Sequence, residues 1–167
     1  MRAGGAGPSR GGLTTKIHLA ADSRCRPLAR VTSAGQRHDS LALLPLMGRL
    51  KVTRAERGRP RTRPGWVLAD KAYSSRAIRG SLRRRRIQTI IPEPADQTKA
   101  RLRKGREGGR PPAFDREAYK QRNTVERAIN KLRQRRAAAT RYDKRDFVYR
   151  GTVDVAAILI WRRDPVT

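Results

Sequence analysis

The stretch YKQRNTVERAINKLR, residues 119–133, predicts an amphipathic helix around which the rest of the chain is organised. At about 100° per residue, four of its polar side chains fall within roughly a 60° arc: Tyr119, Arg122, Glu126 and Arg133. An apolar stripe that includes Val125 and Leu132 lies beside this row. A carboxylate that borders the core needs partners, so we expect the row to be more than a solvated basic face.

The beginning of this helix is well marked. Asp115 is a good N-cap, and Phe114 with Tyr119 predicts a hydrophobic staple across it. Pro111 and Pro112 prevent the helix from starting earlier.

Length and charge narrow the class of protein. A chain of 167 residues is long enough for one domain with a modest core. Its formal net charge of +27 destabilises the folded chain unless a polyanion screens it, so nucleic acid is the expected partner. No apolar run approaches the roughly 20 residues of a membrane span, and Cys25 is the only cysteine. We therefore expect a cytoplasmic, basic protein with no membrane partner, no disulfide framework and no cysteine-based zinc site.

The first third of the chain predicts a flexible lead-in, a hairpin and a helix. Residues 1–12 are rich in glycine and favour neither strand nor helix. Alternating apolar residues predict strands over 13–21 and 27–32. Asp22 lies in the turn between them, where capping of the backbone is more common than catalysis.

A helix is predicted over 40–50, with Asp39 as its N-cap and Pro45 as a point where it kinks or ends. His38 and Asp39 form a possible site pair, but capping is the interpretation that we favour.

The middle of the chain predicts a strand, a helix, a strand and two basic segments. Residues 66–70 form an apolar run typical of a strand buried within a sheet, and Asp70 ends it where α/β folds present their sites; a plain cap is the alternative for Asp70. A helix over about 74–86 and a strand over 87–91 follow.

The basic loops 51–65 and 93–113 suit phosphate contact, and we expect 94–112 to be disordered without nucleic acid. After a basic break at 140–146, residues 152–162 predict a last helix.

Several separated motifs resemble the DDE transposases of bacterial insertion sequences, most closely the insertion sequence 4/insertion sequence 5 group. The blocks are GGLTTKIHLAAD, AGQRHDS, LADKAYSS, GRPPAFDREAYKQRNTVERA and TRYDK, in the family's order. The resemblance covers nearly the whole chain, from Gly11 to Arg163. It implies an α/β fold of the ribonuclease H-like type, a mixed sheet with flanking helices over 13–163.

The resemblance also implies chemistry: metal-dependent cleavage and transfer of DNA strands, with Mg²⁺ held by carboxylates. Asp70 matches the family's second acid and Glu126 its third, and both would be catalytic metal ligands. Tyr119, Arg122 and Arg133, with Lys71 beside the second acid, would bind DNA. Arg133 stands where the family usually has lysine, and its forked guanidinium differs from a point charge.

The family's first acid and its opening strand have no counterpart, because residues 1–12 contain no Asp or Glu. We therefore expect an incomplete fold that lacks the first strand, folds poorly alone and does not cleave DNA alone. A truncated or decayed copy and a frameshifted product remain open, and assembly into a homo-oligomer on DNA is possible. The alternative function is that of a non-catalytic basic DNA-binding protein or a remnant fragment.

Overall fold

The structure is a computed structural model that describes residues 7–9, 12–54, 57–140 and 145–163. Its contacts divide the chain into two compact units. Unit 1 comprises Met1–Thr62 and Asn123–Thr167, and unit 2 comprises Arg63–Arg122.

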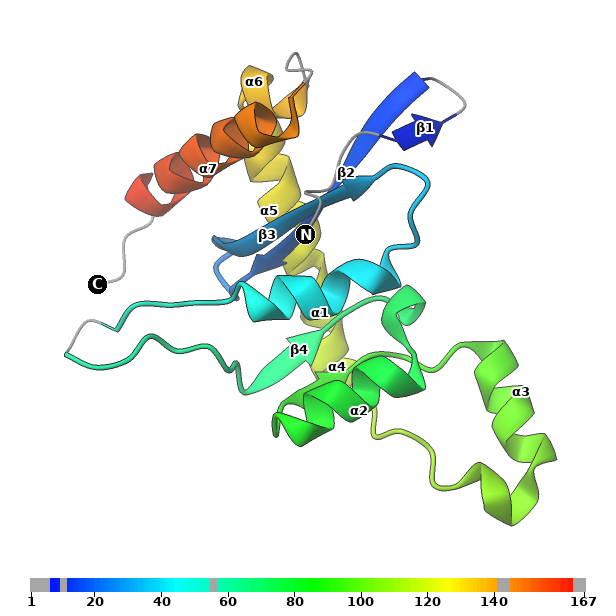
Figure 1. The fold of residues 1–167 in the computed structure, drawn as a ribbon. Coiled ribbons are helices and arrows are strands. Elements are labelled where there is room, and N and C mark those ends of the chain that lie inside the picture. Colours follow the sequence, from blue (N-terminus) through cyan, green and yellow to red (C-terminus); the bar gives the residue numbers. More distant parts are fainter. Residues whose placement is uncertain (1–6, 10–11, 55–56, 141–144, 164–167) are drawn as a thin grey trace. The chain divides into compact units, whose positions relative to one another are not determined.

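The sheet of unit 1 is an antiparallel hairpin with a short third strand (Figure 1). The strands β1 (Gly7–Ser9), β2 (Gly12–Ala21) and β3 (Pro27–Ala34) lie in the order β1-β2-β3. Residue pairs such as Leu19 and Arg30 set the register of β2 on β3. The predicted hairpin is confirmed. The prediction that 1–12 contains no strand was wrong for Gly7–Ser9, which pair with β2, whereas residues 1–6 and 10–11 lie outside the described part of the chain.

Helices cover both faces of this hairpin (Figure 1). On one face, Val31 of β3 packs with Ala42 and Leu46 of α1 (Ser40–Gly48). On the other face, Leu19 joins a core cluster supplied by the helices α5 (Asn123–Arg133), α6 (Arg136–Ala139) and α7 (Asp146–Arg163), whose buried members include Leu132 and Val153. The alternation predicted for residues 16–21 thus produces a layer of strands between two layers of helices.

Two helices of unit 1 differ from their predicted extents. Pro45 does not end α1, which continues to Gly48. The last helix begins at Asp146 instead of residue 152, because Asp146 lies in its first turn and forms an ion pair of 3.0 Å with Arg150 one turn later. The basic break at 140–146 is therefore shorter than predicted, and residues 141–144 lie outside the described part of the chain.

Unit 2 is built on a parallel pair of strands joined through a helix. In β4 (Trp66–Leu68) and β5 (Gln88–Ile90), Trp66 lies opposite Gln88 and Leu68 opposite Ile90. The chain segment that connects the two strands forms the 3₁₀ helix η1 (Lys71–Tyr73) and then α2 (Arg76–Arg84). The hydroxyl of Ser75 caps α2. The elements predicted over 66–70, 74–86 and 87–91 are confirmed in kind. The prediction that 66–70 is buried within a sheet was wrong: among the described strands β4 pairs only with β5, and Trp66 is 41% exposed.

The basic segment after β5 is ordered, contrary to the prediction of disorder. It forms α3 (Ala95–Arg103) and the 3₁₀ helix η2 (Gly105–Gly108), which folds back on it. A Cβ added at Gly108 would lie 2.1 Å from the carbonyl oxygen of Arg101, so only glycine permits this close approach. We call residues 95–108 the arm; Figure 1 shows α3 apart from β4 and α2.

The helix predicted over 119–133 is divided. Residues Arg116–Tyr119 form α4, Lys120–Arg122 form the 3₁₀ helix η3, and α5 follows. The predicted start is confirmed, because Asp115 accepts a hydrogen bond of 3.0 Å from the amide of Ala118 and the rings of Phe114 and Tyr119 lie 5.1 Å apart. The break places Tyr119 and Arg122 in unit 2, and Glu126 and Arg133 in unit 1.

Candidate functional site

Asp70 lies immediately beyond the carboxyl end of β4. Its Oδ1 accepts a hydrogen bond of 2.5 Å from the amide of Lys71, so it caps η1. Its side chain is exposed, and no cation among the described residues pairs with it. Asp70 therefore has a capping role in this structure and retains carboxylate oxygens that face solvent.

Glu126 lies in the first turn of α5, where a negative charge is favourable beside the helix N-terminus. The prediction that it borders the core was wrong, because its side chain is exposed. Its carboxylate forms no hydrogen bond or ion pair with another described residue. Glu126 is suited to bind a ligand because its carboxylate is exposed and unpaired among the described residues.

Asp70 belongs to unit 2 and Glu126 to unit 1. Their convergence on one site therefore stays a prediction. Within the described residues, no three His, Cys, Asp or Glu side chains gather so as to hold a metal ion. The two exposed carboxylates are hard oxygen donors, so they fit a divalent ion as part of a donor set.

The other candidate acids are engaged elsewhere. Asp22 accepts hydrogen bonds from the amide and guanidinium of Arg26, which confirms the predicted role in the turn. Asp39 occupies the N-cap position of α1 but does not cap it; its carboxylate lies 2.8 Å from the ammonium of Lys16. His38 bonds to Ser40 instead, so the capping predicted for Asp39 was wrong and the His38–Asp39 pair is not formed.

The residues expected to bind DNA are accessible. Lys71 begins η1 beside Asp70, and its side chain is exposed. The guanidinium of Arg122 lies 5.5 Å from the centroid of the Tyr119 ring, close enough for a cation–π contact. Arg133 is exposed at the end of α5. These positions suit contacts to phosphate, and their part in DNA binding stays a prediction.

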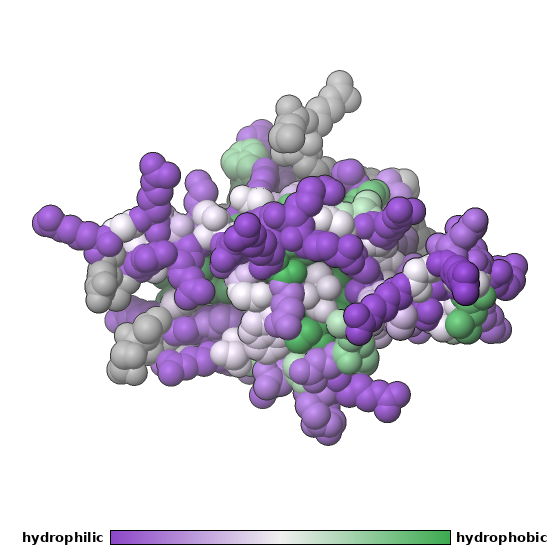
Figure 2. Space-filling view, turned by 90° about the horizontal axis from the view of Figure 1, so that it is seen from below, coloured by the Kyte–Doolittle hydropathy of each residue, from purple (hydrophilic) through white to green (hydrophobic). Residues whose placement is uncertain are grey.

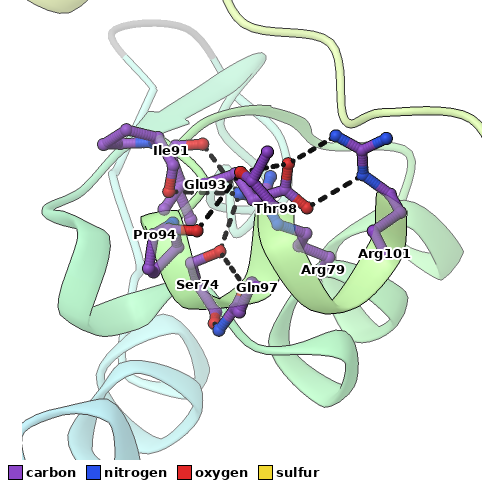
Figure 3. A network of polar contacts seen from close by, with 9 residues as sticks. Ser74, Arg79, Ile91, Glu93, Pro94, Gln97, Thr98 and Arg101 are labelled. Atoms are coloured by element: carbon purple, nitrogen blue, oxygen red, sulfur yellow. Dashed lines mark hydrogen bonds and ion pairs between the residues drawn. The ribbon is translucent and has the colours of Figure 1, made fainter. Parts of the chain in front are cut away.

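A polar network in unit 2 was missed by the sequence reasoning (Figure 3). Glu93 accepts hydrogen bonds from Arg101 at 3.0 Å and from Thr98 at 3.0 Å. Gln97 donates to the carbonyl oxygen of Ser74 at 2.6 Å and accepts from its hydroxyl at 3.0 Å. The network thus connects α3 to the residue that directly follows η1.

Arg79 forms the half-buried centre of this network (Figure 3). Its guanidinium donates to the hydroxyl of Ser74 at 2.9 Å and to the carbonyl oxygen of Ile91 at 2.7 Å. Burial lowers the pKa of Arg79, with Glu93 acting in the opposite direction. The hydrogen bond from Arg101 is the main reason that the pKa of Glu93 lies below its usual value.

Two features of the sequence could have indicated this network. Pro94 lies immediately before the helix, where its extended backbone fits the fixed φ of proline. Thr98 and Arg101 lie about one and two turns into the helix, close enough for their side chains to bond to Glu93. The density of charge in 94–112 concealed both signals.

Figure 2 shows hydrophilic side chains over most of the visible face, with small apolar areas between them. No helix in the described residues is both long and apolar enough to cross a bilayer.

Comparison with known proteins agrees with these features. The chain matches the family described as "Transposase DDE domain" over residues 2–161. It is 36% identical over 77 residues to a protein named as a transposase for insertion sequence element IS402 of Burkholderia cepacia, a match that covers 46% of this chain and 36% of that protein. It is 26% identical over 151 residues to a protein named as a transposase for insertion sequence element IS6501 of Brucella ovis, covering 90% of this chain and 100% of that protein.

The chain thus spans about a third of the first of these relatives and the whole of the second. No solved structure matches it. The family match covers almost all of the chain, and the mixed α/β arrangement of small sheets and helices is compatible with it. The chain therefore belongs to the transposase DDE domain family, and its role is in DNA transposition.

Proposed function

We propose that this chain supplies two carboxylates, Asp70 and Glu126, to a metal-dependent centre that cleaves and transfers DNA strands. The observation that carries the proposal is the position of Asp70. It lies exposed beyond the carboxyl end of β4, a strand parallel to β5, which is where sheets of α/β proteins hold their ligands. Glu126 is the second donor because it is exposed, without a described partner, and within the motif NTVERA.

The residues around the two acids would bind the DNA backbone. Lys71 follows Asp70 directly, and its ammonium is a compact positive charge suited to a phosphate oxygen. Arg122 can bind phosphate through its fork of donors while it remains near the Tyr119 ring. Arg133, at the end of α5, supplies a further exposed positive charge.

A divalent ion such as Mg²⁺, when bound, would activate the attacking hydroxyl and stabilise the leaving oxygen. Asp70 and Glu126 would hold it, but two carboxylates are a small donor set for this chemistry. We therefore propose that a third acid joins them from outside the matched motifs, and that this chain alone does not cleave DNA. The corresponding fold is of the ribonuclease H-like type, with a mixed sheet and flanking helices.

The test is a nicking assay on supercoiled DNA with Mg²⁺ or Mn²⁺. The chain alone should show no cleavage, and cleavage should appear once a strand that carries an aspartate is supplied. The variants Asp70→Asn and Glu126→Gln should each abolish that cleavage while leaving DNA affinity nearly unchanged.

Asp96→Asn is a matched control, because Asp96 is an exposed acid of unit 2 outside both motifs. It should retain full cleavage. Nicking by the chain alone that is lost in Asp70→Asn would show that no third acid is needed. Cleavage that survives both motif variants would overturn the assignment of the two acids.

A further inference from the structure

The arm is a helix without a core. No residue of α3 is buried, so burial of apolar surface does not hold it in place. Its connections to the rest of unit 2 are polar: the Glu93–Arg101 ion pair, the Glu93–Thr98 hydrogen bond and the two Gln97–Ser74 hydrogen bonds. The position of α3 therefore depends on a few hydrogen bonds.

The two sides of α3 differ in chemistry. At about 100° per residue, Gln97, Thr98 and Arg101 share the side that carries the polar network. Lys99 and Arg103 lie on the opposite side together with Asp96, and all three are exposed; Leu102, at the border of that side, is 66% exposed. Lys104 and Arg106 continue the positive charge into η2. An exposed side with several cations and no described anionic partner fits the backbone of a nucleic acid.

The network leads from α3 to Asp70. Ser74 is 4% exposed, and Gln97 contacts both its hydroxyl and its carbonyl oxygen. The amide of Ser74 donates to the carbonyl oxygen of Lys71 at 2.9 Å, and the amide of Lys71 donates to Asp70. Gln97 is therefore connected to the Asp70 carboxylate through one 3₁₀ turn (Figure 3 shows the Ser74–Gln97 contact).

From this arrangement we propose that the outer side of the arm binds the backbone of duplex DNA and that Gln97 is a positioning residue, which transmits the ordering of the arm to the turn that carries Asp70. DNA is the expected duplex because the chain belongs to a transposase family. This proposal rests on the proposed function in one respect, which is that Asp70 is an active-site residue.

Hydrogen exchange of the full chain, with and without a 30-base-pair duplex, tests both parts. In the wild type, DNA should slow exchange in α3 and, at least several-fold, in the amides of residues 71–74. In the outer-side variant Lys99→Gln/Arg103→Gln, the slope of log affinity against log salt concentration should fall by the amount expected for about two phosphate contacts. This variant should also lose most of the DNA-induced protection at residues 71–74. Both substitutions lie on the exposed side and leave the network intact.

Gln97→Met isolates the coupling, because methionine preserves side-chain length and helix propensity but not the hydrogen bonds. It should bind DNA within about twofold of the wild type, a small change because it removes no phosphate contact, and it should protect α3 but not residues 71–74. Gln134→Met, at an exposed glutamine beyond α5, is the matched control and should behave as the wild type.

Two results would overturn the proposal. Wild-type protection of 71–74 in Gln97→Met would remove the coupling, and an unchanged affinity and salt slope in the outer-side variant would remove the DNA contact. Stronger binding of an RNA duplex than of the DNA duplex would assign the arm to RNA instead. The exchange measurement needs neither metal nor cleavage, so its failure is distinguishable from failure of the nicking assay.

Discussion

The indole Nε1 of Trp161, close to the end of α7, donates a hydrogen bond of 2.7 Å to the carbonyl oxygen of Pro27 at the start of β3. The guanidinium of Arg26 lies 4.3 Å from the centroid of the same indole and forms an ion pair of 2.6 Å with Asp22. These contacts fasten the last helix to the turn of the hairpin across 134 residues of sequence.

Replacement of Trp161 by phenylalanine should therefore destabilise the protein. An aromatic ring remains for Arg26, but the carbonyl oxygen of Pro27 loses its donor, so the free energy of unfolding should fall by about 1 kcal/mol. Urea unfolding followed by circular dichroism measures the change. The matched variant Trp66→Phe, at an exposed position, should change it by less than about 0.5 kcal/mol. Equal losses in the two variants would contradict the role of the Pro27 contact.

His18 should make the protein sensitive to mild acid. Its ring is buried and bonds to the hydroxyl of Ser33 at 2.7 Å. Burial lowers the pKa of His18, and Lys16 lowers it further, whereas Asp39 raises it. The unfolded chain therefore binds a proton more readily than the native one, so stability should be constant above about pH 6.5 and should fall as the pH decreases below that value.

Equilibrium unfolding at several pH values between about 7.5 and 5 measures this effect. His18→Gln keeps a hydrogen-bonding group near Ser33 without the charge and should flatten the profile. His38→Gln, at an exposed histidine, should leave it unchanged. A wild-type profile that is already flat over this range would contradict the destabilising effect of the buried ring.

Binding to DNA should depend strongly on salt and weakly on sequence. The charge of +27 includes the basic segments 51–65 and 99–110, which contain exposed arginine and lysine side chains. If these segments provide some 6–10 phosphate contacts, affinity should fall by about 10³–10⁵ between 50 and 200 mM salt. Fluorescence anisotropy on two duplexes of unrelated sequence measures both properties. An affinity independent of salt would rule out binding through phosphates.

The carboxyl carbons of Asp70 and Glu126 should lie within about 10 Å of each other in the assembled complex, because Mg²⁺–oxygen distances are only about 2.1 Å. An experimental structure of the chain with DNA and a divalent ion measures this separation. Asp96 serves as an internal comparison, since no metal role is predicted for it. A larger Asp70–Glu126 separation in such a complex would exclude a shared metal site.

The sequence predicted the hairpin correctly because its signal is local. Every second residue from 17 to 21 is apolar, and these residues point to one face of the strand while residues 16, 18 and 20 point to the other. The structure places Leu19 in one core cluster and packs Ala20 against the other. The turn at Asp22 was also predictable, because a carboxylate that accepts two backbone amides depends on neighbours within four residues.

The errors arose where distant partners decide the structure. Composition predicted that 94–112 would be disordered, but Glu93 and Ser74 hold α3 through hydrogen bonds whose geometry a charge count does not contain. Glu126 was expected to border the core on the assumption of one continuous helix. The 3₁₀ turn at Lys120–Arg122 interrupts that helix. Within α5 the buried residues Ala128 and Leu132 lie more than about 100° around the helix from Glu126, so the glutamate is exposed.

The absence of buried side chains in α3 has an evolutionary consequence. Substitutions at Lys99, Leu102 or Arg103 create no cavity and disturb no packing, so mutation can explore these positions with little effect on folding. During evolution, Glu93, Gln97 and Arg101 can therefore be kept while the exposed residues on the outer side of α3 change. A library randomised at those outer positions would be a practical starting point for redirecting an insertion element toward new targets.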